Sequence, residues 1–423
     1  MSTATRRAYS TVDISSAEFW LRSPEEQDAV FAALRRESPV SWHPPLEGSM
    51  SQAEDDPGFW AVTGAPEIME VSQNPDRFSS DGNLGGVMFD NVPIQVLEYG
   101  SSFLIMDPPE HTKLRRLISA AFTPKRVGLI EDQIRRQARL IVDDFVQHTG
   151  EVDFVEHVAT RLPMWTMSEM VGVPEEMRPA MIRSANAIVG FSDPEDGLSA
   201  DLGMFTALGE LLDMGLQLVE QRRAVPENDL LTGLTQAEVD GERLTDDQIA
   251  SFFVLLCGAG TDTTRNATSM SMKLLADAPE QWRHLAEDVP GRIGPAVEEF
   301  VRYTSPVMTF RRTATCDTEL AGQHVERGDK VVMFYRSGNR DERLFEDPER
   351  FDITRTPNKH IAFGGRGPHT CLGNNLARTQ LRAIFSELVG RIRRIEVGPV
   401  EFVPGATFIR GVKHMSARIV ELV

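Results

Sequence analysis

The chain has 423 residues, of which 41% are hydrophobic and 25% charged, an ordinary composition for a globular protein. Its formal net charge of −19 argues against a nucleic-acid binder, because phosphate neutralisation needs clustered Lys and Arg. No apolar run approaches the roughly 20 residues that cross a bilayer, and the N-terminus lacks the apolar core of a signal peptide. Three widely spaced cysteines, an odd number, indicate free thiols in a reducing, cytoplasmic compartment.

Helical periodicity dominates the sequence. The stretch "SPEEQDAVFAALRRES" (23–38) carries apolar residues at three- and four-residue spacing behind a Ser-Pro start, which predicts an amphipathic helix. Further helices are expected at about 125–148, 176–190, 201–223, 245–277, 293–303 and 374–391. Short strands are expected near 58–64, 311–320, 329–336 and the C-terminus. Length alone suggests two or three domains. Because no linker or fixed-period repeat interrupts the pattern, one large, mainly helical domain is the other option.

The stretch "MDPPEHTKLRRLISAAF" (106–122) combines two prolines with a helical pattern. Proline is favoured at the start of a helix, and His111 and Arg115 are four residues apart, so they share one face. Two donor side chains stacked in this way can bind a carboxylate. Taken alone, the pair is better explained by a solvated helix face.

A long apolar helix is predicted over 245–277, opened by the capping-box pair Thr245 and Gln248. Its middle, "CGAGTDTT" (257–264), breaks the apolar pattern: each glycine costs about 1 kcal/mol relative to alanine, and an acid and several alcohols follow. We therefore expect a kink that holds a small ligand or water around Asp262 and Thr263. A solvent-facing polar turn is the alternative.

In "VEEFVRYTSPV" (297–307), Glu299 and Arg302 are three residues apart on one helical face. Such a pair is usually a surface salt bridge that contributes little stability.

The last signal is "HIAFGGRGPHTCLGNNLAR" (360–378), in which a glycine-rich loop precedes Cys371 and a helical pattern follows it. A thiol at a helix N-terminus is expected to have a lowered pKa, and a thiolate is a nucleophile or a metal ligand. A buried, inert cysteine would not need the glycine loop.

Taken in order, H-x-x-x-R, A-G-x-D-T-T, E-x-x-R and a Phe-Gly loop ending in C-x-G resemble the cytochrome P-450 family of haem-thiolate monooxygenases. The piece "FEDPERF" (345–351) also matches, and the resemblance runs from about residue 20 to the end. It implies the mainly α cytochrome P-450 fold, a triangular prism with small β-sheets and a long central helix over the haem. It also implies a single domain over 1–423, with about 1–20 as an N-terminal arm. One departure is that seven residues, not six, separate Phe363 from Cys371, which leaves the placement of Phe363 open.

The resemblance assigns roles by matching position. Cys371 is the axial ligand of haem b iron, Asp262 and Thr263 are the acid–alcohol pair of the oxygen pocket, and Glu299, Arg302 and Arg350 form a buried network behind the thiolate loop. The haem propionates are assigned to His111, Arg115, Arg312 and His369. Further cofactor contacts are Ala259, Gly260, Thr263, Phe363, Gly364 and Gly373. Substrate-wall residues are Met88, Phe89, Val189, Phe191, Met308, Phe408 and Ile409.

The resemblance also suggests the reaction and its partners. The extra loop residue, "VVMFYRSGNRDE", "NAIVGFSDPED" and "GVKH" are similar to a mycobacterial subgroup that acts on methyl-branched lipids and sterol side chains. We therefore expect a monomer that hydroxylates a hydrophobic substrate, a methyl-branched lipid or isoprenoid at its terminal carbon, with a steroid or sterol side chain or a secondary metabolite as the alternative. Electrons are expected from NAD(P)H through a ferredoxin reductase and a ferredoxin. Basic residues in "HTKLRR" and "TPKRV", with Arg366, Arg378 and Arg382, are expected to form the ferredoxin surface.

Two other classes of protein use some of these features. A cysteine hydrolase could use Cys371 as its nucleophile with His369 as base, but the polar helix around Asp262 would have no role. A haem-thiolate sensor would keep Cys371 and would need neither Asp262 nor Thr263. The presence of that pair favours an enzyme that uses dioxygen.

Overall fold

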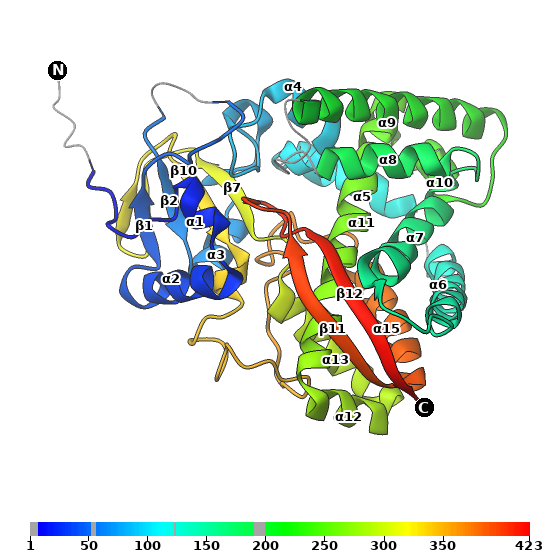
Figure 1. The fold of residues 1–423 in the computed structure, drawn as a ribbon. Coiled ribbons are helices and arrows are strands. Elements are labelled where there is room, and N and C mark those ends of the chain that lie inside the picture. Colours follow the sequence, from blue (N-terminus) through cyan, green and yellow to red (C-terminus); the bar gives the residue numbers. More distant parts are fainter. Residues whose placement is uncertain (1–6, 52–55, 122–123, 190–198) are drawn as a thin grey trace, which may run out of the picture.

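The structure, a computed structural model, describes residues 7–51, 56–121, 124–189 and 199–423. Figure 1 shows a part that contains β1, β2, β7 and β10 together with α1–α3, beside a larger part made mainly of helices. The described chain is mainly α with small sheets, as the sequence predicts.

The described helices include one at each range that the sequence predicts. Their bounds are α1 Ala17–Leu21, α2 Pro24–Glu37, α3 Ala65–Gln73, α4 Ile94–Ser101, α5 Glu110–Ala121, α6 Pro124–Phe145, α7 Arg161–Val171, α8 Arg178–Val189, α9 Ser199–Ala224, α10 Leu230–Gln236, α11 Asp246–Asp277, α12 Pro279–Glu287, α13 Val289–Thr304, α14 Tyr335–Gly338 and α15 Asn374–Arg391. The two capping signals act as expected, because the Ser23 and Thr245 hydroxyls accept from Glu26 and Gln248 at the starts of α2 and α11.

The strands form one sheet of five, one of three and two hairpins. Their bounds are β1 Val40–His43, β2 Phe59–Val62, β3 Phe78–Ser79, β4 Val152–Asp153, β5 Glu238–Val239, β6 Glu242–Arg243, β7 Thr309–Ala314, β8 Thr318–Leu320, β9 Gln323–Val325, β10 Lys330–Phe334, β11 Ile392–Phe402 and β12 Val412–Leu422. The five-stranded order is β1-β2-β10-β7-β3, and the three-stranded order is β11-β12-β4. The predicted strand over 311–320 is in fact two strands that belong to different sheets.

Helix α11 lies in the middle of the helical part and packs against α4, α7, α8, α9, α13 and α15. Its buried residues lie on several faces, which explains why the apolar pattern on its flanks is nearly continuous. Within the described part of the chain, no helix combines the length and apolar character that a membrane span needs.

Candidate active site

A cavity of about 870 Å³ lies between the middle of α11, the loop before α15, β7 and the segment 403–413. Residues that are distant in sequence meet on its wall. The predicted cofactor residues that line it are Arg115, Ala259, Gly260, Thr263, Arg312, Phe363, Gly364, His369, Cys371 and Gly373.

The loop before α15 turns Cys371 toward this cavity, where the cysteine is exposed. The Cys371 N–H donates to the Phe363 carbonyl over 2.9 Å, and the Asn374 side-chain amide donates to the Cys371 carbonyl over 2.7 Å. The seven residues between Phe363 and Cys371 are therefore accommodated in a closed turn. The Phe363 ring lines the cavity and lies 4.4 Å from the Arg378 guanidinium carbon.

The prediction that the pKa of the Cys371 thiol is lowered is wrong for the protein alone. Although Cys371 is open to the cavity, the surrounding protein desolvates its thiol and raises the pKa, while an N–H from Gly373 and the charges of Arg115 and Arg378 act to lower it. The helix begins at Asn374, three residues after Cys371. A cation bound at the sulfur would deprotonate the thiol outright.

Glycines of the loop before Cys371 allow close packing against α3 in addition to lining the cavity. A Cβ on Gly367 would lie 1.7 Å from the Ser72 carbonyl oxygen at the end of α3, and one on Gly365 would lie 2.3 Å from the Ser72 hydroxyl. Gly364 has a φ of 104°, which disfavours other residues. Gly365 and Gly367 therefore line the cavity and also allow α3 to pack closely against the loop.

Two histidines from distant segments stack beside the cavity. The ring centroids of His111 and His369 are 4.1 Å apart, and no ring nitrogen of either has a hydrogen-bond partner among the described residues. Burial, helped by the charge of Arg115, lowers the pKa of His111 to about 4. Burial, helped by the charge of Arg312, lowers that of His369 to about 2. Buried polar atoms are normally satisfied, so these imidazoles indicate a binding site for a group with acceptor atoms.

Helix α11 runs unbroken through 257–264, so the predicted kink does not interrupt it. The Thr263 hydroxyl faces the cavity and donates to the Ala259 carbonyl over 2.9 Å. A Cβ on Gly260 would lie 2.5 Å from the Met167 sulfur, so this glycine also allows α7 to pack closely.

Asp262 is buried behind the cavity wall and is not among the described residues that line it. Its Oδ1 lies 2.9 Å from Arg265 Nη2, and its Oδ2 has no partner among the described residues. Burial raises the pKa of Asp262, against the opposing charge of Arg265.

Glu299 and Arg302 are fully buried, so the surface salt-bridge alternative is wrong. Arg302 Nε lies 2.7 Å from Glu299 Oε2, and its Nη1 donates to the carbonyls of Asn339 and Pro348. Arg350 was expected to contribute its charge, but only its carbonyl accepts from Arg302, over 3.2 Å. The second guanidinium at Glu299 belongs to Arg355, whose Nε lies 3.3 Å from Oε2.

A second carboxylate, missed in the sequence, joins both ends of the Cys371 loop. Glu298 accepts from Arg378 Nε over 2.7 Å and lies 3.0 Å from His360 Nε2. Burial opposes its ionisation, but these two partners prevail and lower the pKa of Glu298 to about 2. Its position beside Glu299 in "VEEFVR" was the available signal.

The predicted substrate wall is partly corrected. Met88, Phe408 and Ile409 line the cavity. Phe89 and Met308 instead lie in a separate apolar core with Trp20, Phe59 and Phe334, because alternate residues of an extended segment point in opposite directions. The side chain of Val189 and all of Phe191 lie outside the described residues.

Comparisons with known proteins agree with this geometry. A family model described as Cytochrome P450 matches residues 210–394. A methyl-branched lipid omega-hydroxylase of Mycobacterium tuberculosis is 40% identical over 382 residues, 89% of this chain and 87% of that protein. A steroid C26-monooxygenase of Rhodococcus jostii is 38% identical over 366 residues, 86% of this chain and 75% of that protein.

A solved structure of a Mycobacterium marinum cytochrome P450 in complex with pseudoionone has a TM-score of 0.93 and 49% identity, and the match covers 98% of this chain and 100% of that one. The mainly helical fold and the cysteine-bearing cavity define the class of a haem monooxygenase. This chain belongs to the cytochrome P450 family.

The described cavity residues fit the haem that this family implies. They offer one cysteine sulfur, buried imidazoles without other partners, and the guanidinium groups of Arg115 and Arg312 within the same cavity. Arg115 Nη2 also donates to the Thr370 carbonyl over 2.5 Å, which ties α5 to the cysteine loop.

Proposed function

We propose that this cytochrome P450 hydroxylates a methyl-branched lipid or isoprenoid at or near the end of its chain. The observation that carries the proposal is the largely apolar cavity into which Cys371, Thr263, Met88 and Phe408 all face. The curated relatives named for methyl-branched lipid omega-hydroxylation and steroid C26 oxidation support this substrate class. A steroid side chain is the second candidate, because both classes present a branched hydrocarbon end.

In this proposal the residues around the cavity have defined roles in binding the cofactor. Cys371 would ligate the iron through its sulfur, and His111, Arg115, Arg312 and His369 would hold the propionates, since Arg115, Arg312 and His369 line the cavity and His111 stacks on His369. Bound haem supplies the activation of dioxygen and the insertion of one oxygen atom into a C–H bond, which thiolate donation favours. The protein residues orient the substrate and deliver protons.

Proton delivery is the task we propose for α11. The Thr263 hydroxyl lies on the cavity wall and can turn from the Ala259 carbonyl to a water in the cavity. Asp262, next to it, is buried with one unpaired oxygen and a raised pKa, so it can take a proton from solvent water and pass it on toward Thr263, while Arg265 stays charged and holds the other oxygen.

The experiment compares branched and linear lipids of equal chain length. Branched members are expected to shift the haem from low to high spin and to give products oxidised at the chain end, identified by mass spectrometry. Primary C–H bonds at the chain end are stronger than internal C–H bonds, so terminal hydroxylation requires a cavity narrow enough to admit only the chain end to the reaction site. A methyl branch helps to fix the orientation of the substrate in that cavity.

Thr263→Ala is the matched variant in this experiment. It should keep the spin shift but form less product for each NADH consumed, because electrons leave as peroxide. Tight binding of polar macrocycles without any response to branched lipids would rule out the substrate class, and unchanged coupling in Thr263→Ala would rule out the role of that hydroxyl.

We further propose that electrons pass from NAD(P)H through a ferredoxin reductase to a small acidic ferredoxin that docks near the cysteine loop. Arg366 and Arg382 are exposed there. Part of the expected basic surface is already neutralised within the chain: Lys113 and Arg116 pair with Glu242 and Asp240 of the β5–β6 hairpin, and Arg378 pairs with Glu298. The side chains of Lys125 and Arg126 lie outside the described residues.

Charge reversal tests this docking surface. Arg366→Glu combined with Arg382→Glu should slow ferredoxin reduction of the enzyme about tenfold at low salt, because electrostatic steering accelerates association by that order. Lys113→Glu should have a smaller effect, since its charge is partly compensated. Arg393→Glu combined with Arg394→Glu, at two exposed arginines on β11, is the control with the same change of net charge. Equal low-salt rates for the two double variants would contradict the docking face.

A further inference from the structure

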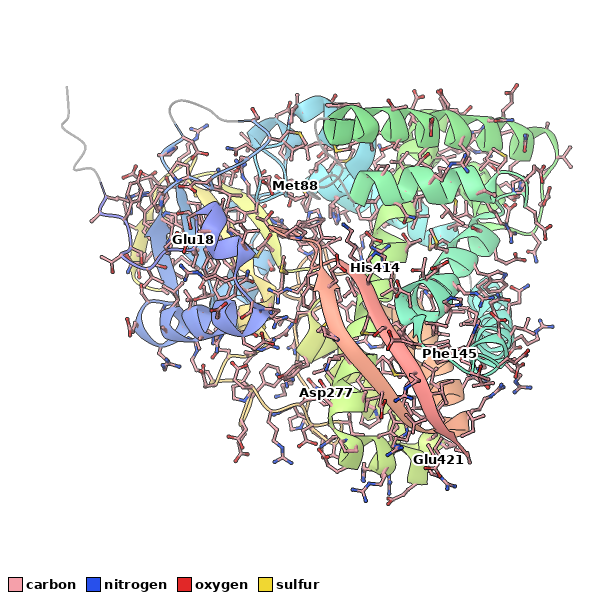
Figure 2. The ribbon with its side chains drawn as sticks, in the orientation of Figure 1. Glu18, Met88, Phe145, Asp277, His414 and Glu421 are labelled. Atoms are coloured by element: carbon pink, nitrogen blue, oxygen red, sulfur yellow. The ribbon has the colours of Figure 1, made fainter. Side chains whose placement is uncertain are left out.

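Two carboxyl groups, those of Asp90 and Glu131, belong to the described residues that line the cavity. Asp90 lines the cavity beside Met88, Val92 and Phe310. The segment that carries it runs along β7, where the Arg311 N–H donates to the Val87 carbonyl over 2.7 Å. Figure 2 labels Met88, two residues before Asp90, where the sheet-containing part meets the helices.

Asp90 is held in place by a neighbouring segment of the wall, which contains Thr407. The Thr407 hydroxyl donates to Asp90 Oδ2 over 2.5 Å, and the Thr407 carbonyl accepts from the Thr309 hydroxyl over 2.8 Å. This chain of bonds joins the Asp90 segment, β7 and the segment before Phe408. The carboxyl is therefore fixed in orientation, as a group that recognises a ligand must be.

The cations behind Asp90 are bonded to other groups. Lys330 Nζ lies 2.8 Å from Asp56 Oδ2 and 3.0 Å from Asn91 Oδ1, and Arg311 Nη1 donates to the same Asn91 oxygen over 3.2 Å. Burial raises the pKa of Asp90, even though the Thr407 hydroxyl and the charge of Lys330 oppose this.

The other carboxyl among the described lining residues is in a different situation. Glu131 on α6 accepts from Arg135 over 2.6 Å, an ion pair at the protein surface. Among the described residues, no ion pair of this kind satisfies Asp90. It is thus a polar group without a dedicated cation, facing a cavity that must take up a lipid.

We propose that Asp90 determines specificity by binding a hydroxyl group at the non-reacting end of the substrate. This inference rests on the proposed lipid hydroxylation and narrows its substrate to a branched lipid that carries an alcohol rather than a carboxylic acid. A hydroxyl can donate to an ionised Asp90 and can accept from a protonated one, so it satisfies either form. A lipid carboxylate would bring two acidic groups together, and each would oppose ionisation of the other.

The test measures the spin-shift affinity of three ligands with one methyl-branched skeleton, which end in a methyl group, an alcohol or a carboxylate. The wild-type enzyme should bind the alcohol about tenfold more tightly than the hydrocarbon, the effect of one buried hydrogen bond to a charged or polar group, and the carboxylate less tightly than the alcohol. Asp90→Ala should reduce the alcohol-to-hydrocarbon ratio to about one while leaving the hydrocarbon affinity in place.

Two variants complete the design. Asp90→Asn keeps a polar amide that can accept from Thr407, so it should keep part of the alcohol preference and should bind the carboxylate better than the wild type does. Glu131→Ala should leave the alcohol-to-hydrocarbon ratio unchanged. Since each ratio is taken within one variant, a general loss of stability does not produce the expected pattern.

The possible outcomes distinguish the Asp90 assignment from the proposed lipid hydroxylation on which it rests. If the hydrocarbon and the alcohol both shift the spin state and Asp90→Ala leaves their ratio unchanged, the Asp90 assignment is wrong and lipid hydroxylation stands. If no ligand of the series shifts the spin state of the wild-type enzyme, the lipid substrate class is wrong and the Asp90 assignment falls with it.

Discussion

Cys371→Ser is expected to abolish the red-shifted Soret band that the reduced carbon monoxide complex of a haem-thiolate protein shows. The sulfur of Cys371 is the thiol that faces the cavity, with its N–H held by the Phe363 carbonyl. A serine hydroxyl has nearly the same shape but is far less acidic than a thiol, so it does not supply the thiolate that binds the metal. The measurement is the difference spectrum of the purified variant.

The two remaining cysteines are the controls. Cys257 is buried within α11, where burial raises the pKa of its thiol, and Cys316 is exposed near β8, away from the residues that line the cavity. Cys316→Ser and Cys257→Ser should both keep the band. If Cys371→Ser keeps the band while one of these variants loses it, the assignment of the iron ligand is wrong.

Glu299→Ala is expected to yield little or no haem-loaded protein. Its loss would leave the fully buried Arg302 without its carboxylate and would also free the Asp352 N–H and the Asn358 amide, which donate to Glu299 over 2.9 and 3.0 Å. Breaking a buried ion pair costs about 3–5 kcal/mol, because the remaining charge stays uncompensated. The cofactor site is affected through Asn339, which accepts from the Ile361 N–H at the start of the cysteine loop over 2.7 Å.

Asp277→Ala is the matched control, because it also removes one carboxylate that is paired with a cationic side chain. Asp277, labelled at the end of α11 in Figure 2, forms an exposed pair with Lys273. Exposed pairs of this type contribute about 0–1 kcal/mol, so this variant should express and load haem normally. Thermal denaturation and the haem-to-protein absorbance ratio measure both effects. A red Glu299→Ala protein with the thermal stability of Asp277→Ala would contradict the proposal that the buried Glu299–Arg302 pair stabilises the cysteine loop.

The sequence was sufficient for features that depend on local spacing. Capping residues at Ser23 and Thr245 and the apolar period behind them predicted where α2 and α11 begin, because these hydrogen bonds span only three residues. In the same way, the glycine loop and the helical pattern behind it predicted a presented cysteine at 371. Strand β11 was missed because it follows α15 directly, without a turn signal between Arg391 and Ile392.

Tertiary structure decided which side chains meet, since that depends on packing between segments far apart in the chain. It placed Phe89 and Met308 in a core away from the cavity, whereas Met88 and Phe408, their neighbours in sequence, line it. It also put the Arg355 side chain, rather than that of Arg350, at Glu299. The sequence alone determined that a glycine loop presenting a cysteine, a polar stretch in a core helix and a Glu–Arg pair belong to one chain. Only the fold, by bringing residues 90 and 407 into hydrogen-bond contact across 317 positions, put a carboxyl group on the wall of the cavity.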